Sequence, residues 1–302
     1  MRIWRKVMST EIKRATGLLV IEVVNSNPNG DPDREGEPRQ RPNGLGEISP
    51  VSFKRKLRDL LEDTGSPFFC SLPEEYKKNA QNYRILESRG RDRKEVSNEM
   101  GDTTVGKFDQ TKFLNSTFVK KYWDGRVFGN TFLEEKADKG FIKTGAVIFS
   151  VGLSLSPVQI VRHTNTNKAG VQEGKQQGMA PLAYRIVEHG VYCMPFFVNP
   201  NYAYKTGCTV KDIELLKFII PHAYNQTKSA IRPDVRLRHA WYIEHKNNLG
   251  SCPEYLLIEA LMPKRVEQTQ EASNSWQDYI DTNGLPASLK AMVASCEDLV
   301  KV

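Results

Sequence analysis

The most constraining feature of this chain is the run GLLVIEVV at residues 17 to 24, which is apolar apart from one Glu and rich in β-branched side chains. A short apolar run bounded by Gly17 and by the turn-forming NSNPNGDPD is typical of a buried strand. Asn, Pro and Gly are frequent in residues 25 to 49, which predicts a long surface loop. Ser49 and Pro50 then favour a helix start, because a hydroxyl caps the first turn and proline has no N–H to leave unpaired there. The chain therefore opens with a strand, a loop and a helix.

The remaining apolar segments continue this alternation. Helical spacing of Phe53, Leu57, Leu60 and Leu61 predicts a helix over 50 to 62, and Thr209 with Asp212 is a capping-box pattern that opens a second helix to about Tyr224. Val, Ile, Phe and Tyr predict strands at 126 to 132, 145 to 155, 184 to 198, 237 to 245 and 254 to 262. Without insertions the order is strand, helix, strand, strand, helix, strand. This predicts an α+β fold of the RRM-like, ferredoxin-like split βαβ type.

Three segments fall outside this pattern. Residues 64 to 123 are dominated by charged and small polar side chains, which predicts an insertion of short helices and loops outside the core. Residues 157 to 182 are poor in large apolar side chains and are interrupted by glycines, which predicts a projecting hairpin. The apolar spacing from Leu285 to Leu299 predicts a C-terminal amphipathic helix.

Composition limits the function classes. The net charge of +7 and the pI near 9.0 favour a polyanionic partner. No apolar run approaches the roughly 18 residues that cross a bilayer, and the basic N-terminus lacks the apolar region of a secretory signal, so we expect a cytoplasmic protein without a membrane partner. Five scattered cysteines without a CxxC pair predict reduced thiols and no zinc site.

The charge distribution of helix 50 to 62 is unusual. Lys54, Arg55, Lys56 and Arg58 precede Asp59, Glu62 and Asp63, which is opposite to the order that the helix macrodipole prefers. An anion such as phosphate, bound beside the N-terminus of this helix, would compensate for the misplaced charges. The alternative is an ordinary solvated basic face.

Other cationic side chains cluster in the predicted loops and strands. A basic track with a projecting hairpin suits a single-stranded nucleic acid, in which cations hold the backbone and apolar side chains contact bases. Met179 is a candidate wedge, although its spacing alone favours a packing role at the base of the hairpin. The candidate cations are Arg126, Arg162, His163, Lys168, Lys175, Arg232 and Arg236.

Catalytic patterns are weak. DPDREG at 31 to 36 resembles half of a calcium loop, but the twelfth position is Pro42 and no helices flank it. Asp31 and Asp33 in a loop of this composition more often cap turns than bind a metal. There is no HExxH, Walker loop or GxSxG. We therefore expect no catalytic residue, no metal and no cofactor.

Several motifs, in order along most of the chain, resemble the backbone subunit of type I CRISPR effector (Cascade-type) complexes in the RAMP superfamily, most closely the type I-C branch. The first two motifs together are the most specific part of the resemblance. The motifs are NSNPNGDPD (25 to 33), PVSFKRKLRDLL (50 to 61), GRVFGNTF (125 to 132), SLSPVQIVRHTNTN (154 to 167), MAPLAYRIVEHGVY (179 to 192) and the stretch from 206 to 250.

This resemblance implies a discontinuous RRM-like palm (17 to 63, 124 to 156 and 183 to 262), a helical finger or web insertion (64 to 123), a β-hairpin thumb (157 to 182) and a C-terminal helical segment (263 to 302). It implies several copies along one CRISPR RNA, with other effector subunits, that present the spacer for pairing with target DNA. Backbone contact is implied for the four cations of helix 50 to 62 and for Arg126, Arg162, His163 and Arg232, with Met179 as the wedge. In such complexes base pairing reads the sequence and the protein contacts the backbone, which agrees with the basic residues in this chain.

Two other functions stay open. A RAMP-type endoribonuclease would cut target RNA through Asp31 or Asp33, or repeat RNA through His163. A monomeric RRM-type messenger-RNA binder would need the RNP1 aromatic pattern, which no predicted strand carries.

Overall fold

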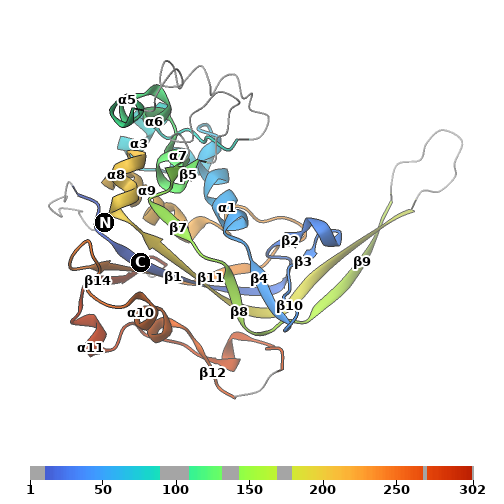
Figure 1. The fold of residues 1–302 in the computed structure, drawn as a ribbon. Helices are drawn as coiled ribbons and strands as arrows, with labels where there is room; N and C mark the ends of the chain where they lie inside the picture. Colours follow the sequence, from blue (N-terminus) through green and yellow to red (C-terminus); the bar gives the residue numbers. More distant parts are fainter. Residues whose placement is uncertain (1–10, 89–108, 131–142, 169–178, 268–270, 301–302) are drawn as a thin grey trace, which may run out of the picture.

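The computed structural model describes residues 11–88, 109–130, 143–168, 179–267 and 271–300. These residues form an antiparallel sheet in which the strand order is β14-β11-β1-β10-β8-β4, while β7 and β9 also pair with β10 (Figure 1). The strands of this sheet are β1 (Ala15–Ser26), β4 (Leu45–Ile48), β7 (Val147–Phe149), β8 (Gly152–Pro157), β9 (Ile160–Lys168), β10 (Met179–Val198), β11 (Val235–His245) and β14 (Val293–Asp298).

Two layers cover the sheet. Figure 1 shows α1, α7 and α9 on one side of it and α10 with α11 on the other. The helices are α1 (Pro50–Glu62), α2 (Pro67–Cys70), α3 (Glu74–Lys78), α5 (Gln110–Asn115), α6 (Thr117–Lys121), α7 (Trp123–Phe128), α8 (Pro200–Thr206), α9 (Val210–Ile219), α10 (Glu254–Leu261) and α11 (Ala287–Lys290). Small elements connect them: β2 (Gly30–Asp31), β3 (Glu37–Pro38), β5 (Gly129–Asn130), β6 (Lys143–Thr144), β12 (Lys264–Arg265), β13 (Tyr279–Ile280) and the 3₁₀ turns η1 (Pro32–Arg34), η2 (Ala80–Asn82), η5 (Ile220–His222) and η6 (Trp276–Asp278).

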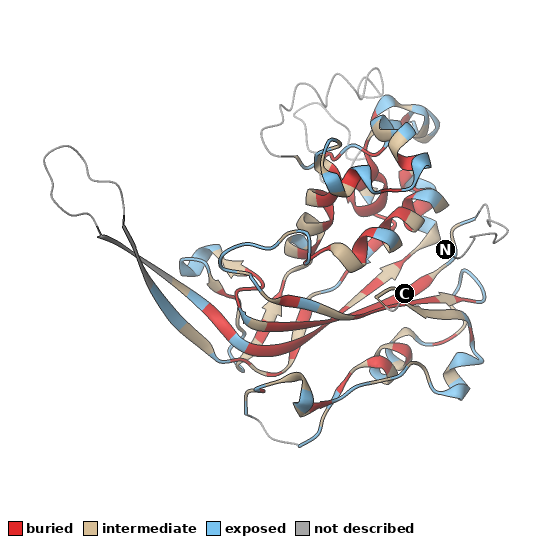
Figure 2. Cartoon of the chain, turned by 180° about the vertical axis from the view of Figure 1, so that it is seen from behind, coloured by how far each residue is buried: buried red, intermediate tan, exposed pale blue. Residues whose placement is uncertain are grey.

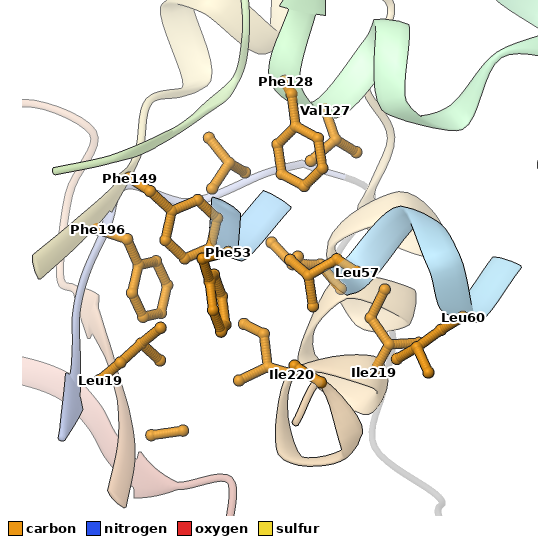
Figure 3. Close-up of a cluster of buried hydrophobic side chains, with 14 of the residues drawn as sticks. Leu19, Phe53, Leu57, Leu60, Val127, Phe128, Phe149, Phe196, Ile219 and Ile220 are labelled. Atoms are coloured by element: carbon orange, nitrogen blue, oxygen red, sulfur yellow. The ribbon is translucent and has the colours of Figure 1, made fainter. Parts of the chain in front are cut away.

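Local signals explain the two main helices. Ser49 accepts a hydrogen bond from the Ser52 N–H at 3.2 Å, which caps α1 as predicted. Thr209 and Asp212 form a complete capping box at the start of α9. Phe53 and Leu57 of α1 are fully buried, and the Phe53 ring lies 5.1 Å from that of Phe149 on β7 (Figure 3). The caps set where these helices begin, and their apolar faces set how they pack against the sheet.

The α+β prediction is confirmed. Along the chain β1, α1, the β7 and β8 segment, β10, α9 and β11 follow the predicted order of strand, helix, strand, strand, helix and strand. Both α1 and α9 pack on the same sheet face, because Leu57 and Leu216 belong to one buried cluster with Leu19 of β1. The two helices and four strand positions therefore make one split βαβ unit.

The C-terminal third differs from the prediction. Residues 254 to 262 were expected as a strand but form α10, in which Leu257 and Leu261 are buried one turn apart. The helix expected from Leu285 to Leu299 is wrong: α11 has four residues, and β14 follows it along the edge of the sheet. There Val293 to Asp298 pair with β11, so available sheet edge overrides helical spacing.

Three other expectations also change. The loop 25 to 49 contains β4, which pairs with β8 in the main sheet. The strand expected at 126 to 132 is helix α7 up to Phe128. The insertion 64 to 123 was expected outside the core, yet Phe69 and Trp123 are buried in the main cluster. Isolated apolar anchors in a charged segment therefore contribute to the core when neighbouring helices enclose them.

Strand β10 is the longest element among the described residues, with 20 residues. Its second half pairs with β1 in the centre of the sheet, and its first half pairs with β9 from Ile160 opposite Val187 to Lys168 opposite Met179. Figure 2 shows the part of β10 in the centre of the sheet mostly buried, whereas Tyr184 is half-buried and Arg185 exposed where the strand enters the hairpin. The predicted hairpin strands are therefore present, whereas its centre at 169–178 lies outside the described residues.

The opposite face of the sheet carries a second apolar cluster. Leu18 and Val20 of β1 pack there against Leu257 and Leu261 of α10. Within the ranges described above, no helix has the length and apolarity needed to span a membrane.

Candidate nucleic-acid interface

Arg58 on α1 is not a free cation. Its side chain is buried, and Nε donates to Asp124 of α7 at 2.8 Å. Asp124 is also buried and accepts the Leu86 N–H at 2.6 Å, while the Arg58 guanidinium reaches Glu87 at 3.0 Å. This guanidinium joins α1 to α7 and to the segment before residue 88, so its charge is already paired, and RNA contact at Arg58 stays a prediction.

Arg126 is buried and paired with a carboxylate in the same way, and RNA contact at this residue also stays a prediction. It is 6% exposed and bonds Asp212 of α9 through Nε at 3.0 Å and Nη2 at 2.7 Å. Its Nη1 donates to the carbonyls of Val119 and Lys120. Burial alone would lower the pKa of Arg126, but the hydrogen bonds and charge of Asp212 outweigh this, so its pKa is raised. Arg126 therefore holds α7 to α9 as a buried bidentate pair.

The other cations of α1 are partly accessible. Arg55 is half-buried and bonds Asp59 at 2.7 Å as well as Glu62 on the same helix. Lys54 is half-buried, with its ammonium 5.3 Å from the centre of the Phe128 ring. Burial, followed by the charge of Arg58, lowers the pKa of Lys54. Lys56 is also half-buried. The first turn of α1 has no acidic side chain and its last turn has no basic one. Part of the positive charge of the helix is already paired with acids of the same helix or lies over the Phe128 ring.

The segment directly after β1, residues 27–29, is called the Asn-rich loop here, and it joins the cap of α1 to the hairpin. Asn29 Oδ1 accepts the Ser49 N–H at 2.7 Å. Asn27 Nδ2 donates to the carbonyl of Gly36 at 2.7 Å and to that of Arg185 on β10 at 3.3 Å. The sequence predicted a loop here but did not reveal that these amides organise it. Turn-forming Asn residues directly after a buried strand were the available signal.

Arg232 joins this region, whereas Arg236 does not. Arg232 Nε donates to the Asn27 carbonyl at 2.9 Å, so its guanidinium lies beside the loop. Burial lowers the pKa of Arg232. Arg236 instead bonds Asp234 at 2.7 Å and Glu22 of β1 at 3.3 Å. Glu22 alternates with Ile21 of the main core, so Arg236 lies on the opposite face of the sheet from α1.

Glu22 is the centre of a buried polar group on that second face. It is 2% exposed and accepts from Arg238 at 2.8 Å and from His189 at 3.4 Å. Burial alone would raise the pKa of Glu22, but the bonds from His189 and Arg238 and the charge of Arg236 hold it below the ordinary value of 4.5. This group links β1, β10 and β11 and leaves Arg236 with carboxylate partners.

Two of the predicted contact residues lie exposed on the hairpin. Arg162 and His163 of β9 are exposed, and Arg162 lies directly opposite Arg185 of β10. Arg185 forms an ion pair with Glu37 of β3. Lys168 and Met179 face each other in the backbone register at the end of the described strands, while Lys175 lies outside the described residues. Like charges directly opposite each other are destabilising, and here the Glu37 carboxylate offsets part of the repulsion by pairing with Arg185.

The predicted acidic residues are placed as turn formers. Asp31 Oδ1 accepts the Asp33 N–H at 3.2 Å at the start of η1, and Arg39 approaches the same carboxylate at 3.6 Å. Within residues 11–88, 109–130, 143–168, 179–267 and 271–300, no group of three His, Cys, Asp or Glu side chains has metal-binding geometry. Asp31 therefore has the turn-capping role that loop composition favours.

Comparison with protein families gives the assignment. Residues 13–283 match the model of the family described as CRISPR-associated protein Cas7. The chain belongs to the Cas7 family. A curated relative, the CRISPR-associated protein Cas7 of Haloferax volcanii, is 26% identical over 240 residues, covering 73% of this chain and 67% of the relative. The matched region of the Cas7 model includes α1, the Asn-rich loop, the hairpin and β11.

Solved structures with a similar fold include three CRISPR complexes. A chain of a CRISPR RNA-guided surveillance complex in a pre-nicking state is 13% identical, with a TM-score of 0.43, and the match covers 76% of this chain and 78% of that chain. A chain of a second CRISPR RNA-guided surveillance complex is 15% identical, with a TM-score of 0.34, and the match covers 74% of this chain and 68% of that chain. A chain of a type III-B Cmr-beta complex bound to cognate target RNA is 12% identical, with a TM-score of 0.39, and the match covers 77% of this chain and 61% of that chain. Likeness at this level adds no argument about function.

Proposed function

We propose that this Cas7 chain is a multi-copy backbone subunit of a CRISPR RNA-guided surveillance complex. It binds the spacer of the CRISPR RNA through the RNA backbone, without reading sequence, and presents it for pairing with target DNA. Its partners are the CRISPR RNA, other copies of the chain, other effector subunits and, through the guide, target DNA. The observation that carries this proposal is a projecting hairpin, inside the matched family region, on which two arginines face each other.

Charge placement supports RNA-backbone contact at part of the predicted set. Phosphates attract cations whose charge is not already used by a buried carboxylate. Arg162 and His163 are exposed, Lys54 lies on α1 beside the Phe128 ring, and Arg232 lies beside the Asn-rich loop. We assign the RNA path to these four residues and propose the same for Lys56, Lys168, Lys175 and the wedge Met179. Arg55 is a weaker contact, because Asp59 and Glu62 share its guanidinium.

The finer organisation follows the same proposal. Residues 64 to 123 act as the finger or web, and 157 to 182 act as the thumb of an RRM-like palm. Type I-C is the proposed branch, supported by the motifs after β1 and in α1. The chain works in the cytoplasm, where its RNA is made.

Reconstitution tests this function directly. The chain is expressed with type I-C partner subunits and a repeat-spacer array, and the nucleic acid that copurifies is sequenced. Spacer-containing RNA, bound to several copies of the chain, is the expected result. Bare protein, or random cellular RNA on single copies, would contradict the backbone role.

A charge-matched pair of variants locates the interface. We expect Arg162→Glu to weaken RNA binding about tenfold or more and to flatten the salt dependence, because fewer counterions are released. Lys290→Glu makes the same charge change on α11, an exposed position on the far side of the sheet from α1, and should bind as the wild type (Figure 1). Equal affinities for the two variants would place the RNA elsewhere.

We also propose that the subunit does not cut RNA. Asp31 Oδ1 is already bonded to the Asp33 N–H, and the His163 ring lies against Tyr184. Incubation of the purified complex with target RNA, repeat RNA and Mg²⁺ should leave both RNAs intact. Fragments that disappear in Asp31→Ala, Asp33→Ala or His163→Ala would instead establish the endoribonuclease.

A further inference from the structure

The described part of the hairpin presents two chemically different faces. Directly opposite residues of antiparallel strands share a face, and successive pairs alternate between faces. The pair Arg162 and Arg185 therefore lies on one face of the β9 and β10 ribbon, and the next pair, His163 and Tyr184, lies on the other. The ribbon is thus cationic on one side and aromatic on the other.

The cationic face is turned toward the Asn-rich loop. Arg185 pairs with Glu37 of β3, and its carbonyl accepts from Asn27. Since Arg162 shares this face, the His163 and Tyr184 rings lie on the side away from β3. A ligand held by the arginine face therefore reaches the ring face only around the edge or the end of the ribbon.

The two rings form a flat, accessible stack. Their centroids lie 5.9 Å apart with an interplanar angle of 14°. His163 is exposed and Tyr184 is half-buried. Two other stacked pairs in the described chain, Phe149 with Phe196 and His239 with Trp241, are buried. An exposed stack on a projecting ribbon therefore has a role other than core packing.

We propose that the His163 and Tyr184 rings are a stacking platform for an unpaired nucleobase of the bound RNA. The inference rests on the proposed RNA binding and deepens it by naming a base contact on the face opposite the arginines. Every base has a π-face, so such a platform adds affinity without selecting sequence. One strand of RNA crossing the ribbon would give its phosphates to one face and a displaced base to the other.

Substitution at Tyr184 in the reconstituted complex tests the platform. Tyr184→Leu should bind spacer RNA about tenfold more weakly, and Tyr184→Phe, which keeps the ring, should bind as the wild type. Because Tyr184→Leu changes no charge, the slope of log affinity against log salt should stay unchanged. Arg162→Gln should instead reduce that slope by about 0.7.

An abasic scan identifies the contact as a base. RNAs with one abasic site at successive positions should lose affinity for the wild type at the stacked position and lose none there for Tyr184→Leu. If both proteins respond identically at every position while spacer RNA still copurifies, the platform is wrong and the backbone function stands. If the wild type binds no RNA, the backbone function itself fails.

A measurement on the unmodified chain tests the platform even if Tyr184→Leu does not fold. RNA carrying 2-aminopurine at successive positions should show quenched fluorescence at the stacked position on binding. Uniform fluorescence along the bound RNA would overturn the proposal. Loss of self-association in Tyr184→Leu, with an unchanged abasic profile, would also overturn it and would assign the rings to a neighbouring copy.

Discussion

Arg126 and Arg162 are the same residue type, and both were predicted to contact RNA, yet they lie in different surroundings. Arg126 is 6% exposed and clamped by Asp212, whereas Arg162 is exposed and faces another arginine. The buried guanidinium is fully used in joining two helices. The exposed one keeps its charge available to an anion. Burial and the nearest carboxylate, rather than the residue type, decide which role an arginine has.

The largest effect is expected at the buried member of this comparison. Arg126→Met should lower the free energy of unfolding by about 3 to 5 kcal/mol, because it leaves the Asp212 carboxylate buried without its partner. Denaturant titration measures the change. The exposed Arg34→Met is the control and should stay within about 0.5 kcal/mol of the wild type. A small loss for Arg126→Met would mean that the two arginines differ less than their burial indicates.

An intermediate case is the buried Glu22 with its partly exposed arginine partners. Glu22→Gln should cost about 1.5 to 3 kcal/mol near neutral pH, since charged hydrogen bonds to His189 and Arg238 are lost. The pKa of Glu22 is lowered in the folded chain, so its stabilisation is fully present above about 4.5 and is lost as pH falls through the lower folded value. Unfolding measured from pH 7 to pH 3 should therefore show the variant and the wild type converging in acid.

The control for this pH dependence is Glu47→Gln. Its carboxylate pairs with Arg41 in a more exposed position, so removal should cost less than about 1 kcal/mol. A gap between Glu22→Gln and the wild type that does not narrow as the pH falls from 7 would show that the variant acts by altered packing rather than by lost charge.

The smallest effect is expected at the exposed member. Arg162→Gln should leave the free energy of unfolding unchanged or raise it by a few tenths of a kcal/mol, because it removes a like-charge pair across the strands. The same denaturant titration measures this at low salt. Destabilisation by more than about 1 kcal/mol would show that Arg162 has a structural partner, and the contrast with Arg126 would fail.

Local signals predicted much of the fold. The hydroxyl of Ser49, the capping box of Thr209 and Asp212, and the apolar run of β1 act within a few residues, so the sequence displays them directly. The C-terminal strand could not be predicted in this way. Leu285 to Leu299 has helical spacing, but β14 forms because the edge of β11 is available in the folded chain.

The candidate interface was harder to predict than the fold. Arg58 lies 66 positions from its partner Asp124, and Arg126 lies 86 from Asp212, so nothing near either arginine reveals that its charge is used. The sequence displays the order of charges along α1. Whether those cations are available to an anion depends on the acids and the Phe128 ring that the fold places beside them. Conversely, Asn27 and Asn29 lie in a motif that the sequence displays, but the motif does not show that their amides connect helix cap, loop and hairpin.

Strand β10 runs without interruption from the hairpin into the centre of the sheet. Nine register pairs join β9 to β10, from Met179 to Val187, and at about 3.3 Å per residue they span roughly 30 Å. Ile186 and Val187 at the inner end of this ladder are buried, and Val187 belongs to the main core cluster. One continuous strand therefore connects the outer pairs to the core, and the length of that strand sets how far from the core they lie.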